Sequence, residues 1–197
     1  IYGVQSVGAP SMQKAIHDQK IETLPTVKTI ADGIAVKRPG DLTYEMVQKY
    51  VDEIVTVTDD EVSTAILELI EQQKMIAEGA GAVSVAAAMF HKVPIEGKNV
   101  VCLVSGGNID VTILSRVIDR GLRKAGRLAE LMIELVDKPG QLLGVSQIIS
   151  RLGGNVVSVF HSRAEVDLDI NACVLRISME TRNQEHLDEI IAEVTKQ

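Results

Sequence analysis

A short run of small polar residues stands where a protein could bring its main chain close to a ligand. Ser105, Gly106, Gly107 and Asn108 follow an apolar stretch, residues 99–104. If that stretch is a parallel strand, Ser105 lies at its carboxyl end, which is where open α/β sheets bind ligands. Two adjacent glycines would let a flat ring approach the backbone, and Asn108 would cap the next helix. The alternative is a tight turn whose serine only satisfies main-chain groups, and the residues alone leave both interpretations open.

Two further positions could face the same ligand. Glu78 stands just before a helix of small residues, in the run AEGAG. Its carboxylate would either favour the positive end of that helix or point into a cleft at the strand ends. Gly33, in the run ADGIA, would either bring bare backbone into the site or only form a turn, with Asp32 in a structural role. The spacing around Gly106 matches neither of the common nucleotide-binding glycine loops.

Other kinds of catalytic site are not indicated. None of the four histidines has a partner at metal-ligand spacing, and the serines, histidines and aspartates suggest no catalytic triad. Cys102 and Cys173 each lie within an apolar run and form no CxxC motif, so we interpret them as small buried residues of a protein from a reducing, cytoplasmic compartment. We therefore predict no metal site.

The composition is that of a globular protein with helices packed on an apolar sheet. Its 197 residues are 46% hydrophobic but only 3% aromatic, so Val, Ile, Leu, Ala and Met must fill the core of one large domain or two small ones. A net charge of -7 and a pI near 5.1 argue against a partner with a phosphate backbone. No apolar run reaches membrane-spanning length. We expect neither nucleic acid nor a membrane as a partner.

The first part of the chain alternates strand and helix patterns, which predicts parallel βαβ crossovers. Acidic residues at 59–61 open one of the helices, where they complement its positive end. A long loop rich in Gly, Pro and Thr covers residues 23–43. The predicted strands are residues 1–6, 53–58 and 99–104, and the predicted helices are residues 10–19, 44–51 and 59–72, with two more within 77–90 and 109–122.

A second pattern begins at Arg127. Apolar and more polar residues alternate in 128–137, which predicts a strand with one polar face. The helix that follows is opened at Gly140 and closed by Gly153, with Leu142 on its apolar side. Two strands and a helix complete the order β, α, β, β, α. A split βαβ sandwich needs one more strand, and the chain starts on an isoleucine, so we expect a piece of a longer protein.

Four segments together resemble a known family, and the region after them resembles a regulatory domain. TIADGIAV, VDEIVTVTDDEV, AEGAGAVSVAAA and CLVSGGNID resemble, in order and spacing, the C-terminal part of the catalytic domain of threonine dehydratase (threonine ammonia-lyase). That family belongs to the fold-type II pyridoxal phosphate enzymes, with serine dehydratase and serine racemase. Residues 127–197, with DKPGQLLGV and GGNVVSV, resemble a regulatory ACT domain. The resemblance implies an α/β fold: part of an open parallel sheet in residues 1–126, then a ferredoxin-like α+β sandwich in 127–197 without its last strand.

The resemblance also implies a chemistry. The family's serine hydrogen-bonds the pyridine nitrogen of pyridoxal phosphate, which gives that role to Ser105, while Gly106, Gly33 and Glu78 would lie around the cofactor ring. The reaction would be α,β-elimination of L-threonine to 2-oxobutanoate and ammonia, under allosteric control, in isoleucine biosynthesis. The family's Schiff-base lysine lies upstream of the resembling part, so we expect this chain alone to be inactive. Serine dehydratase, serine racemase and a non-catalytic amino-acid-sensing or assembly module stay open as alternatives.

For the second region the resemblance implies an effector site. Gly140 and Leu142 stand at the start of a helix whose free amides could hold a carboxylate, and Asn155 matches the position from which relatives contact an amino-acid effector across a paired interface. We expect an amino-acid or nucleotide effector and a homo-oligomer. Some relatives bind a divalent ion near the first strand. The matching positions here, Gln5, Ala9 and Ser11, bring no carboxylate, so that site is not carried over.

Overall fold

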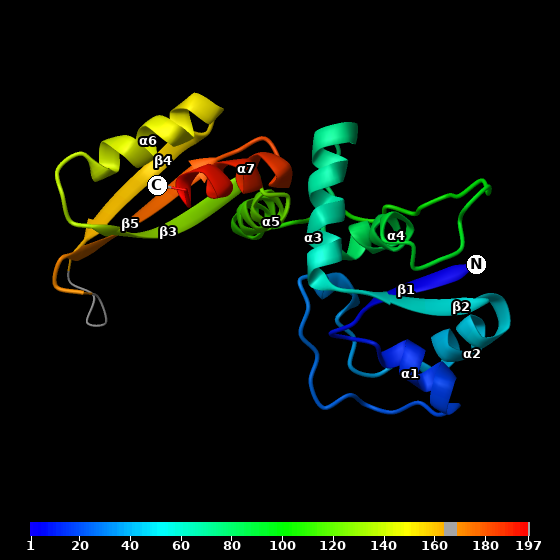
Figure 1. Ribbon diagram of the computed structural model, residues 1–197. Coiled ribbons are helices and arrows are strands. Elements are labelled where there is room, and N and C mark those ends of the chain that lie inside the picture. The colour runs from blue at the N-terminus through cyan, green and yellow to red at the C-terminus, as the bar shows by residue number, and fades with distance from the viewer. Residues whose placement is uncertain (164–168, 197) are drawn as a thin grey trace. The chain divides into compact units, whose positions relative to one another are not determined.

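The computed structural model describes residues 1–163 and 169–196 (Figure 1). The chain divides into two compact units, Ile1–Gly121 and Leu122–Gln197. In the described ranges, no helix combines the length and the apolar content that crossing a membrane requires. The fold is mixed α/β, with a parallel sheet in the first unit and a separate antiparallel sheet in the second.

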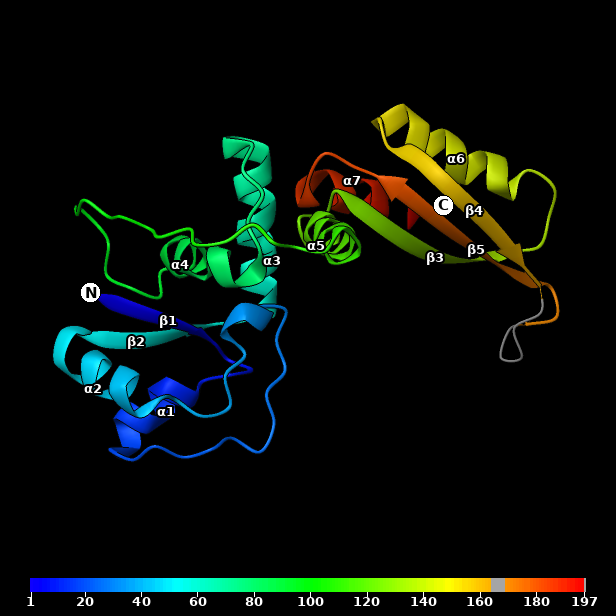
Figure 2. The same ribbon diagram turned by 180° about the vertical axis from the view of Figure 1, so that it is seen from behind.

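The first unit is built around a pair of parallel strands. Its elements in chain order are β1 (Tyr2–Ser6), α1 (Ser11–Asp18), a 3-10 turn (Asp32–Ile34), α2 (Asp41–Tyr50), β2 (Glu53–Val57), α3 (Asp59–Glu68), a π-helical turn (Leu69–Gln73), α4 (Gly79–Met89) and α5 (Val111–Lys124), whose last residues belong to the second unit. β1 and β2 pair from Tyr2 with Glu53 to Ser6 with Val57. α1 and α2 lie on one side of this pair, and α3 and α4 lie on the other (Figures 1 and 2).

The start of α3 follows the acidic pattern in the sequence. Thr58 accepts a hydrogen bond from the Glu61 amide (3.2 Å), and the Glu61 carboxylate accepts one from the Thr58 amide (2.8 Å). This reciprocal cap satisfies two amides that have no partner within the helix. Lys92 adds an ion pair to the other Glu61 oxygen at 2.8 Å. The cap therefore also ties α3 to the segment that follows α4.

The small side chains of α4 allow it to pack closely on the strand pair. Ala82 and Ala86 are fully buried, and the helix contacts both β1 and β2. Val57, Val62 and Ile66 complete the core around it without any exposed surface. Because each of these residues is apolar and tightly enclosed, a longer side chain on this face of α4 would have to displace the strands.

The predicted strand at residues 99–104 is wrong. All of these residues are described, and they form a segment without strand pairing. The segment instead lies along α4, where Ser84 donates a hydrogen bond to the Leu103 carbonyl (2.9 Å) and Cys102 donates one to the Ser84 carbonyl (3.6 Å). Val101 is 94% exposed and Leu103 76% exposed. The apolar run predicts burial on both faces, whereas the segment is covered on one face only.

A second correction concerns the start of α5. Asn108 was the expected cap, but Asp110 accepts hydrogen bonds from the amides of Thr112 (2.8 Å) and Ile113 (3.2 Å). The Thr112 hydroxyl also donates to Asp110. These bonds lower the pKa of Asp110 from its ordinary value, with the Thr112 hydroxyl making the largest contribution. A carboxylate satisfies several first-turn amides at once and also favours the helix dipole.

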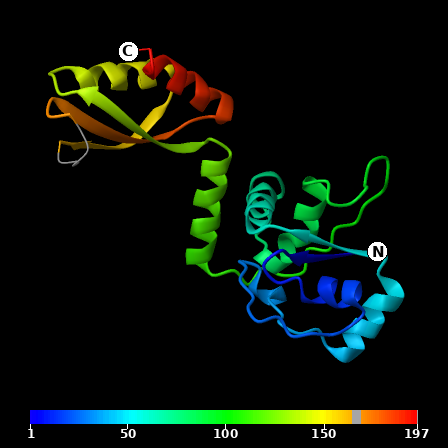
Figure 3. The ribbon, with the colours of Figure 1, turned by 60° about the horizontal axis from the view of Figure 1, so that its bottom comes forward.

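The second unit is an antiparallel sheet with helices on one face. Its elements are β3 (Leu128–Val136), α6 (Gln141–Leu152), β4 (Asn155–Ser162), β5 (Ala172–Glu180) and α7 (Gln184–Val194), in the predicted order. The sheet order is β3-β5-β4, so the central strand comes late in the chain. Figure 3 shows α6 and α7 on the same face of this sheet. Val145, Ile149, Leu175, Ile177, Met179 and Ile190 fill the space between them.

Two details hold the helices of the second unit in place. Gly153 ends α6 in a left-handed conformation (φ 89°), as its position in the sequence predicts. His186, on α7, is 3% exposed, and its ring nitrogens contact the Arg182 amide (3.1 Å) and the Leu152 carbonyl (2.9 Å). The ring accepts at Nδ1 and donates at Nε2, which joins the start of α7 to the end of α6. Leu142, expected on the apolar side of α6, is 42% exposed.

Replacing Glu61 with Gln should make the stability of the first unit less dependent on pH. Burial raises the pKa of Glu61, but the hydrogen bonds from Lys92 and Thr58 outweigh it and lower the pKa below its ordinary value of 4.5. A carboxylate whose pKa is lower in the folded state than in the unfolded state stabilises the protein at pH values above its unfolded-state pKa. That stability is lost as the pH falls through its folded-state pKa. We expect Glu61→Gln to cost about 1 kcal/mol at neutral pH, and less at a pH below the folded-state pKa of Glu61.

Urea unfolding followed by circular dichroism, at neutral pH and at a pH below the folded-state pKa of Glu61, measures this difference. Glu68→Gln is the matched control, because Glu68 is exposed on the same helix. An equal loss of stability at both pH values would show that the ionised carboxylate does not stabilise the cap.

Candidate functional site

Three segments of the first unit meet at the start of α4. The Glu78 amide donates a hydrogen bond to the Gly106 carbonyl at 3.0 Å, which joins the helix to the SGGN run. From the other side, Gly79 lies against Ile30 and Ala31, at the beginning of the segment that carries Gly33. The structure therefore brings together Gly33, Glu78 and Gly106, which the sequence proposes as parts of one site.

This convergence requires the absence of side chains. A Cβ on Gly81 would lie 2.7 Å from the Gly106 carbonyl oxygen, and a Cβ on Gly79 would lie 2.6 Å from the Ile30 carbonyl oxygen. Both distances are shorter than any van der Waals contact, and both obstacles are backbone atoms that cannot rotate away. The Gly/Ala composition of this stretch is therefore explained by two backbone approaches as well as by packing on the strands.

The Glu78 carboxylate lies between the two loops. It makes no capping hydrogen bond to α4. A Cβ on Gly106 would collide with its Oε1 atom, and one on Gly33 would lie 3.5 Å from the same atom. Of the two alternatives left by the sequence, the geometry favours a carboxylate directed towards the loops over one that only caps the helix.

Ser105 is exposed beside this cluster. Its hydroxyl can both donate and accept a hydrogen bond, and the next two residues present main chain without side chains. Such a set of groups can hold the edge of a flat heteroaromatic ring: the hydroxyl can bond a ring nitrogen, and the bare backbone leaves room for the ring face. Glu78 adds one negative charge at the side of this space.

Another partly buried carboxylate holds the Gly33 loop in position. Asp59 accepts a hydrogen bond from the Thr29 hydroxyl at 2.6 Å, and Thr29 in turn accepts one from the Ala31 amide at 3.1 Å. Ser6, at the end of β1, donates to the same Asp59 oxygen at 3.5 Å. The sequence predicts Asp59 only as an acidic residue that favours the helix dipole. No local signal reveals the contact with Thr29, because the two residues lie in different elements.

The second unit places the predicted effector residues in two locations. Gly140 and Leu142 line a pocket of about 310 Å³ at the start of α6. Asn155 does not line that pocket. It lies at the first position of β4, where its amide donates a hydrogen bond to Glu180 at 2.9 Å. Within one chain, the structure therefore joins Gly140 with Leu142 but not with Asn155.

The comparison with protein families decides the affiliation of the chain. The model of the family described as pyridoxal-phosphate dependent enzyme matches residues 1–106, which contain the converging loops and α4. The chain belongs to this family. The cofactor of the family is pyridoxal phosphate, whose pyridine ring has the flat shape and the ring nitrogen that the groups around Ser105 can accommodate. The residues present thus fit one edge of the cofactor.

The relatives include enzymes that act on amino acids. An L-threonine ammonia-lyase of Thermotoga maritima is 45% identical over 190 residues, covering 96% of this chain and 47% of that protein. The processed threonine deaminase isoform 2 of Solanum lycopersicum matches with a TM-score of 0.56 and 35% identity, over 61% of this chain and 34% of that one. Maize serine racemase matches with a TM-score of 0.53 and 32% identity, over 61% and 39%. The chain thus spans slightly less than half the length of the Thermotoga maritima enzyme.

The contacts around α4 predict that alanine is more destabilising at Gly81 than at Gly106. Gly81→Ala should lower the free energy of unfolding by about 1–3 kcal/mol, because its methyl group meets a carbonyl oxygen of the main chain. Gly106→Ala should cost less than about 1 kcal/mol, because it meets the end of the flexible Glu78 side chain. Helix propensity alone would make Gly81→Ala stabilising by about 1 kcal/mol. Urea unfolding of the two variants distinguishes these cases, and a stabilised Gly81→Ala protein would contradict the close approach.

Proposed function

We propose that this chain is part of a pyridoxal-phosphate-dependent threonine ammonia-lyase, which converts L-threonine to 2-oxobutanoate and ammonia by α,β-elimination. The observation that supports it most is the 45% identity to an enzyme named for this reaction, extending over 96% of the chain. The agreement includes both units, so it is not limited to the fold of a cofactor domain. Residues 1–126 would be the C-terminal part of the catalytic domain, and residues 127–197 a regulatory domain of the ACT type.

In this proposal, the residues of the first unit bind and orient the cofactor. Pyridoxal phosphate, when bound, supplies the electron sink that makes loss of the substrate's α-proton and β-hydroxyl feasible. Ser105 would donate its hydroxyl proton in a hydrogen bond to the pyridine nitrogen. A hydroxyl is a far weaker acid than a pyridinium, so this contact leaves the nitrogen largely unprotonated. Gly33 and Gly106 would leave room for the ring, and Glu78 would lie at its side.

A serine-specific enzyme is the second candidate within the family. The similarity to maize serine racemase is nearly as high as that to the tomato threonine deaminase, at TM-scores of 0.53 and 0.56. Serine and threonine differ by one methyl group, which a hydrophobic contact distinguishes only modestly, by about 1–3 kcal/mol. Parallel assays of the complete enzyme for 2-oxobutanoate from threonine, pyruvate from serine and D-serine separate the three activities.

For the second unit, the proposal is allosteric control by a small molecule. Gly140 is the N-cap residue of α6, with a left-handed backbone (φ 94°), and it lines the pocket together with Leu142. Amides at a helix start can hold the carboxylate of an amino acid. Because Asn155 lies outside this pocket, its contribution would have to come from a second copy of the chain. A homo-oligomer, a cytoplasmic location and a role in isoleucine biosynthesis belong to the same proposal, and an assembly module without catalysis is its alternative.

Removing the Ser105 hydroxyl should slow the complete enzyme while leaving its fold intact. We expect Ser105→Ala to reduce kcat for threonine by about tenfold, the equivalent of one lost hydrogen bond of about 1–1.5 kcal/mol. The rate of 2-oxobutanoate formation measures the effect. Ser115→Ala, a change at an exposed serine of α5, is the matched control and should retain full activity. Unchanged turnover in Ser105→Ala would remove this serine from the site.

Calorimetry should detect an effector in the pocket of the second unit. We expect heat of binding with at least one of isoleucine, valine, threonine and AMP. Leu142→Ala should weaken that binding by about tenfold or less, because it removes part of one apolar contact. Leu143→Ala is the matched control, since Leu143 is 61% exposed on the same helix and does not line the pocket. Absence of heat with all four compounds would contradict the sensing role.

A further inference from the structure

Three potential metal ligands meet at one end of the pocket in the second unit. Asp137 follows β3, His161 lies near the end of β4, and Cys173 lies near the start of β5. One carboxylate oxygen, one imidazole nitrogen and the sulfur all lie within 4.8 Å of one another. We propose that these residues form a binding site for a transition-metal ion of the Zn²⁺ type. This inference goes beyond the proposed function and does not depend on it.

The sheet register explains why the three side chains share a face. His161 pairs with Leu175, and Cys173 pairs with Leu135, so these four residues point to the helix-covered side of the sheet. Asp137 continues the same alternation two residues after Leu135. Its amide donates a 2.7 Å hydrogen bond to the Asn171 carbonyl, which fixes the backbone at that point. Two of the ligands therefore project from paired strands and the third directly follows one, and strands hold a site more firmly than loops do.

The three ligand atoms select a particular class of ion. Thiolate and imidazole ligands favour Zn²⁺ and similar transition metals, whereas Mg²⁺ and Ca²⁺ prefer sites made of oxygen. In a tetrahedral zinc site, bonds of about 2.0–2.3 Å place neighbouring ligands about 3.4–3.8 Å apart. The closest approach of His161 Nε2 to Asp137 Oδ1 is 4.0 Å. Closing the site needs shifts of about 1 Å or less, which the partly exposed His161 side chain can provide by rotation.

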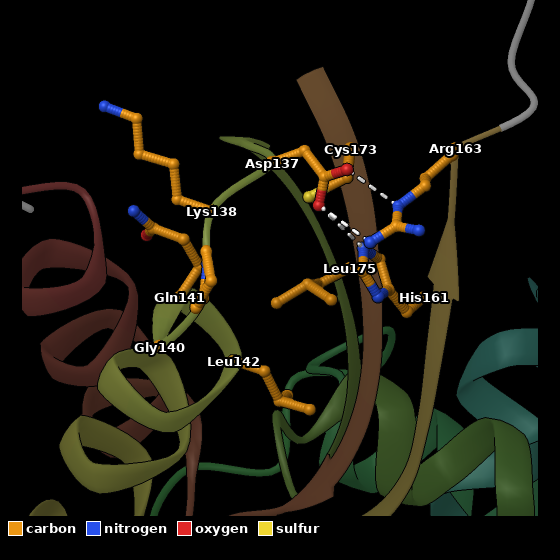
Figure 4. A pocket seen from close by; sticks show the side chains of 10 residues that line it. Asp137, Lys138, Gly140, Gln141, Leu142, His161, Arg163, Cys173 and Leu175 are labelled. Carbon is orange, nitrogen blue, oxygen red and sulfur yellow. Dashed lines mark hydrogen bonds and ion pairs between the residues drawn. The ribbon is translucent and has the colours of Figure 1, made fainter. Parts of the chain in front are cut away.

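The fourth coordination position would face the pocket. Figure 4 shows Asp137, His161 and Cys173 along one wall, with Gly140, Gln141 and Leu142 opposite. Three protein ligands and one open position are the arrangement of zinc sites that bind water or a small ligand. A metal ion here would therefore be reachable from the space next to the α6 helix start.

Arg163 is the group that competes with a metal ion. Its guanidinium contacts both Asp137 oxygens, at 2.7 Å and 3.2 Å. The side chain is 69% exposed, so this ion pair is weak and solvent-screened and can open when a doubly charged ion arrives. Lys138, the other cation of the pocket, extends away from the three ligands in Figure 4. Binding of the ion would also deprotonate Cys173 and release one proton to solvent.

Cobalt titration of the full chain, after treatment with a chelator, tests the site. Co²⁺ occupies zinc sites, and a thiolate ligand gives it a charge-transfer band in the near ultraviolet. We expect this band in the unmodified chain and in Cys102→Ala, and its loss in Cys173→Ala. Displacement of Co²⁺ by Zn²⁺ measures the affinity for Zn²⁺. We expect His161→Asn and Asp137→Asn to lower this affinity by more than the roughly tenfold that loss of an outer-shell partner costs. His161 is 38% exposed on its side chain, so this variant tests the site even if the buried Cys173 variant unfolds.

Arg163→Gln distinguishes a cation site from an anion site. Removal of the competing guanidinium should tighten the binding of Zn²⁺ and Co²⁺. If the pocket instead binds a carboxylate through Arg163, the same variant should bind acetate more weakly and should bind the metal ions no more tightly. The proposal is overturned if the cobalt band is missing, if it persists in a folded Cys173→Ala protein, or if Arg163→Gln weakens metal binding. All of these readouts are spectroscopic, so they stay interpretable whether or not the complete enzyme acts on threonine.

Discussion

The close approach of α4 to the SGGN segment is the constraint on which the first unit depends. A hydrogen bond from the Glu78 amide to the Gly106 carbonyl spans the contact, and a Cβ on Gly81 would prevent it. The same helix start holds the Ile30 segment through Gly79. The position of each loop around the candidate cofactor edge therefore follows from where α4 begins. The two glycines are needed here for geometry, even though glycine weakens the helix itself.

Asp59 adds a second level of control to this arrangement. It is the first residue of α3, with one residue between it and the end of β2, and through Thr29 it fixes the backbone that leads to Gly33. Its other contact, Ser6, ends the neighbouring parallel strand. Since parallel strands present their carboxyl ends on one edge, a residue after one strand can bond a residue at the end of the next. The loop is thus aligned by the sheet, while α4 sets how closely it approaches.

Local patterns predict most of the elements, because each signal lies within one stretch of the chain. The acidic start of α3 and the Gly153 end of α6 are of this kind. The strand predicted at residues 99–104 is wrong because an apolar run indicates burial without showing which element covers it. Here the Leu103 carbonyl accepts a hydrogen bond from Ser84 instead of from a neighbouring strand. The proposed ligands Asp137, His161 and Cys173 cannot be found from local patterns for a similar reason. Metal-ligand spacing is recognised along one segment, whereas here each ligand lies on or next to a different strand.

The two units differ in the kind of chemistry that their own groups can support. The first presents a hydroxyl, bare backbone and one carboxylate, which suits a bound cofactor that carries the reaction. The second presents thiol, imidazole and carboxylate groups on the wall of the pocket that Gly140 and Leu142 also line. Two ligands that share one pocket cannot bind independently, because each changes the charge and space available to the other. A metal ion at Asp137, His161 and Cys173 would attract the carboxylate of an amino acid at the α6 start, and the amino acid would by reciprocity tighten the metal.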